Sequence, residues 1–99
     1  MTLSVGSVVT LECQGDAPNP VGKFLDGDTV RRTVGLAPET GGVFTGTRWT
    51  VHQNGSTFQF ECEGQELGPR ILDGNTINGT VSLVTDMGLS GTRWQVLIN

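Results

Sequence analysis

LDGDTVRRTVGL at residues 25–36 and LDGNTINGTVSL at residues 72–83 are two copies of one phrase. Each copy is followed by the same four letters, Gly-Thr-Arg-Trp, at residues 46–49 and 91–94. The shared letters are mostly glycines, apolar residues and threonines, which are typical of β-strands joined by tight turns. The fold prediction therefore starts from an internal duplication.

The duplication covers most of the chain. Glu-Cys-x-Gly at residues 12–15 recurs at residues 61–64, so residue 12 corresponds to 61, residue 25 to 72 and residue 46 to 91. The offset falls from 49 to 47 to 45, and both changes lie in stretches rich in Gly, Pro or polar residues. Loops absorb length changes more readily than strands, so this pattern indicates a structural duplication. With 99 residues the chain is predicted to be one domain over residues 1–99. It consists of repeat one at about 6–54 and repeat two at about 55–99.

Alternating apolar residues predict four short strands in each repeat and no helix of useful length. The predicted strands are residues 8–14, 23–25, 33–37 and 47–51 in repeat one, and residues 57–63, 70–72, 80–84 and 92–97 in repeat two. The Asp-Gly pairs at residues 26–27 and 73–74 are predicted as turns in which glycine has a positive φ. The expected fold class is all-β.

The same alternation predicts the side chains of the core. Those expected to point inward are Val9, Leu11, Cys13, Val34, Leu36, Trp49 and Val51 in repeat one, and Phe58, Phe60, Cys62, Val81, Leu83, Trp94 and Val96 in repeat two. Each buried indole N–H needs a hydrogen-bond acceptor, and we expect a backbone carbonyl. Both cysteines are expected to be small buried hydrophobic side chains with free thiols.

Composition excludes several classes of partner. The net charge is −4 and the six Lys and Arg residues are scattered, with only Arg31 and Arg32 adjacent. Nucleic acids and anionic membrane surfaces bind clustered cations, so neither is expected. No apolar run approaches the ~20 residues that span a bilayer. The N-terminal residues lack the pattern of a signal peptide, so we expect a cytoplasmic protein, one exported without a recognisable signal, or one matured from a longer precursor.

The order of motifs resembles one repeat of a ricin-type β-trefoil lectin. That repeat runs from an apolar first strand through Leu-Asp and Val-x-Leu to Gln-x-Trp. Repeat two matches with Phe58-x-Phe60, Leu72-Asp73, Val81-Ser82-Leu83 and Thr92-Arg93-Trp94, and repeat one has the same order. The family has three repeats where this chain has two. Thr47 and Thr92 replace its Gln, and Ala37 and Val84 replace an aromatic residue that commonly stacks on sugar.

The resemblance implies a β-trefoil-like fold, with two four-stranded repeats related by internal pseudosymmetry, and a non-catalytic, carbohydrate-binding module. In the family, the aspartate of Leu-Asp accepts hydrogen bonds from sugar hydroxyls, and Asp26 and Asp73 match it. The other polar positions that recur in both repeats complete the set of candidate ligand-binding residues. These are Asp28, Asn75, Arg48 and Arg93.

Structural roles remain open for the same residues. An aspartate in Asp-Gly can cap its own turn instead of binding a ligand. Exposed arginines can pair with a carboxylate such as Glu12 or Glu61, which contributes about 0–1 kcal/mol. Trp49 and Trp94 lie in alternating strands, which favours core packing over sugar stacking.

Two repeats of a three-repeat fold leave strand edges and an apolar seam open. We therefore expect a symmetric homo-oligomer, for example three chains whose six repeats form two trefoils. Alternatively, the two repeats close on themselves as an eight-stranded barrel or sandwich.

No catalytic, cofactor or metal motif is found. Cys13 and Cys62 have no adjacent basic residue to lower their pKa, and His52 has no triad or metal-ligand spacing around it, so we expect it to be solvated. Asp26-Gly27-Asp28 lacks the pattern of a calcium loop. The chain is therefore not expected to be an enzyme. The alternative function is a protein-interaction or inhibitor domain that uses loops 16–22 and 38–45.

Overall fold

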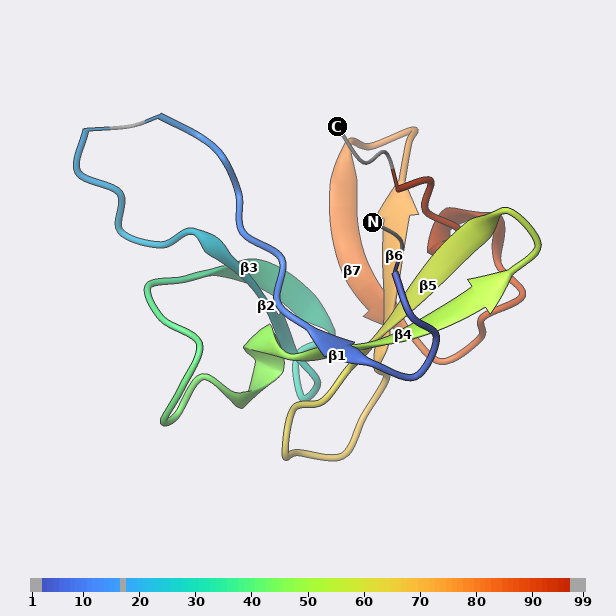
Figure 1. The fold of residues 1–99 in the computed structure, drawn as a ribbon, viewed down its shortest axis with the longest axis horizontal. Coiled ribbons are helices and arrows are strands. Elements are labelled where there is room, and N and C mark those ends of the chain that lie inside the picture. Colours follow the sequence, from blue (N-terminus) through green and yellow to red (C-terminus); the bar gives the residue numbers. More distant parts are fainter. Residues whose placement is uncertain (1–2, 17, 97–99) are drawn as a thin grey trace.

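The chain folds into one antiparallel sheet of seven strands in the computed structural model, which describes residues 3–16 and 18–96. The sheet order is β1-β4-β5-β6-β7-β3-β2, and the sheet curls into a half-barrel (Figure 1). The elements are β1 (Val8–Val9), β2 (Phe24–Asp28), β3 (Thr33–Ala37), the 3-10 helix η1 (Thr45–Thr47), β4 (Trp49–Asn54), β5 (Thr57–Cys62), β6 (Ile71–Asn75), β7 (Thr80–Val84) and the 3-10 helix η2 (Ser90–Thr92). The all-β prediction is confirmed. The described residues do not form a closed eight-stranded barrel.

Corresponding residues of the two repeats make the same pairings. The β2–β3 hairpin pairs Phe24 with Ala37, and the β6–β7 hairpin pairs Ile71 with Val84 at the corresponding register. The bridge between Val9 and Trp49 recurs between Phe58 and Trp94, and the bridge between Glu12 and Phe24 recurs between Glu61 and Ile71. The two copies in the sequence therefore have one local structure.

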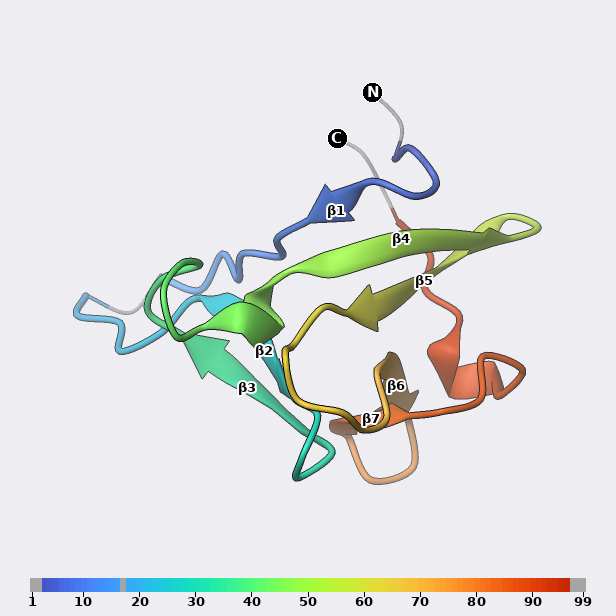
Figure 2. The ribbon, with the colours of Figure 1, turned by 90° about the horizontal axis from the view of Figure 1, so that it is seen from below.

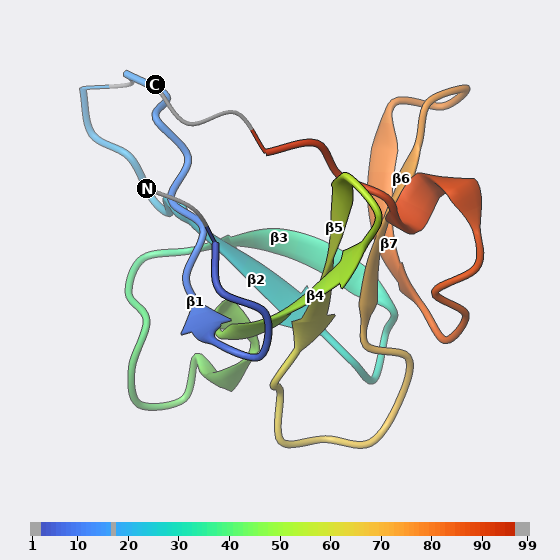
Figure 3. The same ribbon diagram turned by 45° about the vertical axis from the view of Figure 1, so that its right-hand side comes forward.

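A long hairpin, β4–β5, joins the repeats and crosses the middle of the molecule (Figure 2). It reverses at the two-residue turn Gly55-Ser56, where Gly55 has φ +63°. In the sheet, the hairpin β6–β7 follows β5, and the hairpin β2–β3 follows β7, to which it is joined where Thr33 pairs with Ser82 (Figure 3). The sheet is thereby continuous across the two repeats.

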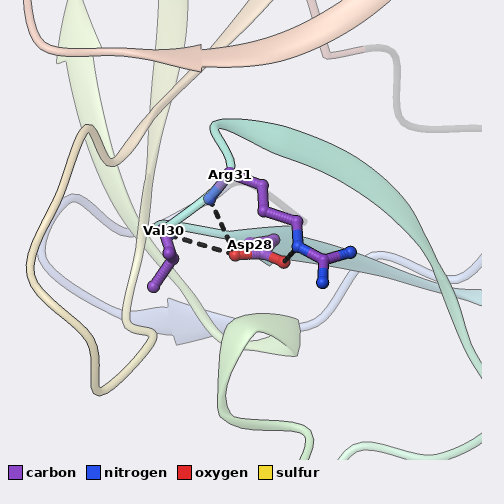
Figure 4. A network of polar contacts seen from close by, with 3 residues as sticks. All are labelled: Asp28, Val30 and Arg31. Atoms are coloured by element: carbon purple, nitrogen blue, oxygen red, sulfur yellow. Dashed lines mark hydrogen bonds and ion pairs between the residues drawn. The ribbon is translucent and has the colours of Figure 1, made fainter.

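The predicted Asp-Gly turns are wrong. Gly27 and Gly74 lie within strands β2 and β6, and the chain reverses one residue later. In repeat one the Asp28 carboxylate caps the turn, because its Oδ1 accepts hydrogen bonds from the backbone N–H groups of Val30 and Arg31, both at 3.0 Å (Figure 4). Asn75 does the same in repeat two.

The first predicted strand of repeat one and the fourth of repeat two differ most from prediction, whereas the predicted 57–63 strand is β5 and the predicted 47–51 strand overlaps β4. Strand β1 has two residues, and the rest of the 8–14 stretch contributes a single bridge at Glu12. Each Gly-Thr-Arg-Trp stretch begins in a 3-10 helix, and Trp94 forms only an isolated bridge. Leu97, the last residue of the predicted 92–97 strand, lies outside the described residues.

The core lies under the β4–β5 hairpin. Its buried members are Trp49, Val51, Phe60, Cys62, Leu72 and Leu83. The prediction of an inward side chain is wrong for three residues. Cys13 is exposed, and Leu36 and Val81 are 51% and 42% exposed. Leu36 is in a strand next to the sheet edge, and Val81 borders a hollow that no described segment fills.

Candidate binding site

The close approach of Gly46 to strand β2 explains the glycine of the Gly-Thr-Arg-Trp motif. A Cβ added at Gly46 would overlap the Gly27 carbonyl oxygen and lie 2.7 Å from Asp26 Oδ1. In repeat two, Gly91 stands in the same relation to Gly74 and Asp73. The motif glycines therefore hold each 3-10 helix against the aspartate of the Leu-Asp-Gly motif.

Threonine and tryptophan in the motif also have structural roles. The Thr47 hydroxyl is buried and donates to the Phe44 carbonyl at 2.7 Å, and Thr92 donates to Leu89 at 2.6 Å. The indole N–H of Trp49 donates to the Leu25 carbonyl at 3.1 Å. Trp94 donates to the corresponding carbonyl in repeat two, that of Leu72, at 3.2 Å. The prediction that each indole finds a backbone acceptor is confirmed.

Asp28 and Asn75, two of the predicted ligand-binding residues, are engaged in the hairpin turns described above. Asp28 also lies 3.9 Å from the Arg31 guanidinium through its second carboxylate oxygen, at the surface (Figure 4). The turn-capping role considered for Asp26 and Asp73 therefore belongs to the residues two positions later.

The carboxylate oxygens of Asp26 are available to accept hydrogen bonds from a ligand. Within residues 3–16 and 18–96, no donor is placed to hydrogen-bond its carboxylate. Its side chain is half-buried, and this burial, followed by the negative charge of Asp28, raises the pKa of Asp26 above its ordinary value. An ionised acceptor that is partly desolvated and unpaired favours a ligand that brings hydrogen-bond donors.

Asp26 borders a pocket of about 220 Å³ between the two repeats. One side comes from β2 and η1, and the other from the loop that follows β5. Its lining residues are Asp26, Gly27, Asp28, Thr29, Val43, Thr45, Gly46, Gly64, Gln65 and Glu66. The Thr45 hydroxyl accepts a hydrogen bond from the Gln65 N–H at 3.3 Å, and this bond joins the two sides.

Arg70 holds the loop wall of this pocket and is absent from the predicted site. Its guanidinium donates to three carbonyls of that loop, those of Cys62 at 2.9 Å, Gly64 at 2.7 Å and Glu66 at 2.9 Å. The corresponding residue of repeat one is also basic, Lys23. A basic residue before the Leu-Asp-Gly motif in both copies is the signal that would have identified it.

The pocket of repeat two is more open. A hollow of about 280 Å³ is lined by Asn75, Arg93 and Trp94 together with backbone of η2 and β6. Asp73 lies against Gly91 but does not line this hollow, and Arg48 is exposed outside the pocket of repeat one. The predicted ligand-binding residues thus gather as Asp26 with Asp28, and as Asn75 with Arg93.

No protein-family model, curated protein sequence or solved structure matches this chain.

Two residues outside the pocket, His52 and Cys62, were also subjects of the sequence predictions. His52 lies in β4 and not in a solvated loop, and its Nε2 is 2.9 Å from Glu61 Oε1, so Glu61 is not the partner of Arg48 or Arg93. Cys62 is fully buried, as predicted, and this burial raises the pKa of its thiol. A buried, protonated thiol is a poor nucleophile.

Within the described ranges, no three His, Cys, Asp or Glu side chains lie where they could hold a metal ion together. In the same ranges, neither 3-10 helix has the length and apolarity needed to cross a membrane.

Proposed function

We propose that the chain is a non-catalytic carbohydrate-binding module with a β-trefoil-like fold. The observation that supports it best is the Asp26 carboxylate, which is half-buried at a pocket and has no hydrogen-bond donor within the described residues. Sugars present several O–H donors on a rigid ring, so they match an acceptor in this position. The Leu-Asp, Val-x-Leu and x-x-Trp order of both repeats supports the same family of folds.

The remaining pocket chemistry also suits a polyhydroxyl ligand. Glu66 adds a second acidic residue to the lining beside Asp26, and Thr45 adds a hydroxyl. The volume of about 220 Å³ is below the ~300–1,000 Å³ of pockets for drug-sized ligands. We therefore propose that the pocket binds a single sugar ring, such as the end of a glycan.

A glycan array followed by calorimetry on the best glycan tests the proposal. Asp26→Asn keeps the size of the side chain and removes its charge, so it should weaken binding roughly 10- to 100-fold, since a hydrogen bond to a charged group contributes about 1.5–3 kcal/mol. The matched control is Asp73→Asn, the corresponding change in the more open repeat, which should weaken binding less. An array without a hit, or a ligand whose affinity is the same for Asp26→Asn, would overturn the assignment.

The second candidate function is a protein-interaction or inhibitor domain. Val21 and Val43, in the two loops whose length differs between the repeats, are 93% and 88% exposed. Exposed apolar side chains on loops are common in protein interfaces. Affinity capture with the native chain and with Val21→Ser/Val43→Ser as matched baits tests this candidate. Proteins retained equally by both baits would argue against it.

We also propose that the chain functions as a homo-oligomer. In the arrangement expected from the sequence, three chains supply six repeats to two trefoil-like barrels. One chain then opens at the turn between β4 and β5 so that its repeats join different barrels. The open edges of the half-barrel support this proposal.

A further inference from the structure

Corresponding residues of the two repeats differ sharply in burial on one face. In repeat one, Thr29 is 4% exposed and Gly27 is buried, because the loop after β5 covers Thr29 and Cys62, at the end of β5, covers Gly27. In repeat two, the corresponding Thr76 is exposed and Gly74 is only partly covered. We call residues 74–76 and 91–96 the uncovered face. It has the local structure of a surface that is covered in repeat one.

The segment that covers repeat one is the Glu-Cys-x-Gly stretch of repeat two, residues 61–64. The Cys62 Sγ lies 3.7 Å from the Gly27 carbonyl oxygen and 3.6 Å from that of Gly46. Gly64 is buried against Thr29, where an added Cβ would lie 3.4 Å from the threonine methyl group. Glu-Cys-x-Gly in repeat two is therefore the segment that packs on the Leu-Asp-Gly motif of repeat one.

Within the described residues, the same segment of repeat one covers no Leu-Asp-Gly motif. Cys13 and Gly15, which correspond to Cys62 and Gly64, are both exposed. We call residues 10–15 the free edge. Its backbone is hydrogen-bonded on one side only, where the Cys13 N–H donates to Lys23 and the Leu11 carbonyl accepts from Leu25. In the described residues, the N–H groups of Thr10, Glu12 and Gln14 have no backbone acceptor.

The pairing between the repeats shows how the free edge can be completed. Within the chain, β4 pairs with β5 so that Trp49 lies opposite Cys62 and Val51 lies opposite Phe60, and the Glu63 N–H donates to Arg48 at 2.8 Å. The corresponding pairs on the unpaired surfaces are Trp94 with Cys13 and Val96 with Leu11. Leu11, Trp94 and Val96 all border one apolar hollow of about 380 Å³.

We infer that the free edge of one copy of this chain docks on the uncovered face of a second copy, repeating between chains the contact that joins repeat one to repeat two. Cys13 then lies over Gly74 and Gly91 of the neighbour, and Gly15 closes the hollow of repeat two as Gly64 closes that of repeat one. The inference rests on the homo-oligomer proposed above and names its surfaces. It is independent of the ligand, because neither surface includes Asp26.

Disulfide trapping on the full chain tests the register of this contact. In Gly74→Cys, the new thiol should meet Cys13 of a neighbouring copy, since a Cβ placed at Gly27 lies 2.8 Å from Cys62 Sγ within the chain. After mild oxidation we expect dimers and larger species on a non-reducing gel, several-fold above the level of Val30→Cys, an exposed position in the β2–β3 turn outside both surfaces. Adding Cys13→Ser should abolish them.

A second pair of cysteine substitutions leaves Gly74 unchanged, so it tests the same contact even if Gly74→Cys fails to fold. Gly15→Cys with Thr76→Cys, in a Cys13→Ser background, should cross-link between copies because Gly64 lies against Thr29 within the chain. Sedimentation of the unmodified chain should give a mass above that of the 10.5 kDa monomer. A monomer at micromolar concentration, or an oligomer in which neither pair cross-links above the control, overturns the inference. A glycan array without hits would overturn only the proposed ligand.

Discussion

Gly27 lies against the indole of Trp49, so that a Cβ added to the glycine would be 3.1 Å from the ring carbon Cη2. The added atom would also lie 2.8 Å from Cys62 Sγ and 3.2 Å from a methyl carbon of Leu83. All three neighbours belong to the buried core. The glycine of the Leu-Asp-Gly motif therefore makes room for the core, which the turn interpretation missed.

Gly27→Ala should therefore destabilise the fold by about 1–3 kcal/mol, the usual effect of overpacking a core. The change should appear as a lower midpoint in urea unfolding followed by tryptophan fluorescence. Gly74→Ala is the matched variant and should cost less, because its nearest neighbour is Trp94 at 3.2 Å on a partly exposed face. Gly35→Ala has no atom within 4 Å of the new methyl group and serves as the control. Equal losses for Gly27→Ala and Gly35→Ala would contradict the packing argument.

Arg32→Gly should stabilise the protein. Arg32 has φ +63° in the β2–β3 turn, where repeat two has Gly79 with φ +70°. A non-glycine residue in this region costs about 1–2 kcal/mol, and the greater freedom of glycine in the unfolded chain offsets part of that gain. We expect a net gain of up to about 1 kcal/mol in thermal or urea unfolding. Arg31→Gly, one residue earlier in the same turn, should lower stability, and a gain of the same size there would point to charge rather than backbone strain.

Asp26 should make stability depend on pH in a defined direction. Its pKa is raised in the folded protein by burial and by Asp28, so the folded state binds a proton at a higher pH than the unfolded state. Stability should therefore increase as the pH falls from neutral through the folded pKa towards the ordinary value of 3.8. Asp26→Asn should be more stable than the native chain at pH 7, and this difference should shrink as the pH approaches 3.8.

Urea unfolding of both proteins across this pH range measures the effect. Asp16→Asn removes the same charge at an exposed position outside the pocket, so it corrects for net charge. A difference between Asp26→Asn and the native chain that does not change with pH would show that the carboxylate is not the cause.

Arg70→Ala should loosen the loop wall of the pocket. The variant loses three hydrogen bonds from a charged donor to the carbonyls of residues 62–66, and we expect a loss of about 1.5–3 kcal/mol in stability. Hydrogen exchange should rise at Gly64, Gln65 and Glu66, and glycan affinity should fall with it. Lys23→Ala, the corresponding change in repeat one, should have a smaller effect because no described residue accepts a side-chain hydrogen bond from it.

The sequence predicted the repeated framework well because it depends on local patterns. Strands β3 and β7 have the predicted bounds, and Trp49 is in the core with its N–H on a backbone carbonyl. The Asp-Gly turn was wrong because glycine signals both a turn and a close approach, and only the three-dimensional structure brings Trp49 onto Gly27. Cys13 was wrong for a different reason, since burial at an edge depends on what lies beyond it.

The candidate site was predicted only in part. Repetition in the sequence selected Asp26 and Asp28 together, but it did not distinguish the acceptor at the pocket from the one engaged in the turn. Arg70 was missed because its partners are backbone carbonyls, which leave no trace in side-chain motifs. The pocket itself is formed between two repeats, so neither repeat alone predicts it.

The β4–β5 hairpin has a consequence for the order in which the chain folds. The contact between the repeats begins at a two-residue turn, Gly55-Ser56, so its loop-closure entropy is small even though it joins the two halves of the molecule. Hairpins of this kind form within about 1–10 μs, before segments that are far apart in the sequence, such as those of Thr33 and Ser82, pair. Changes in this turn should therefore slow folding, whereas changes at the N-terminal strand should mainly speed unfolding.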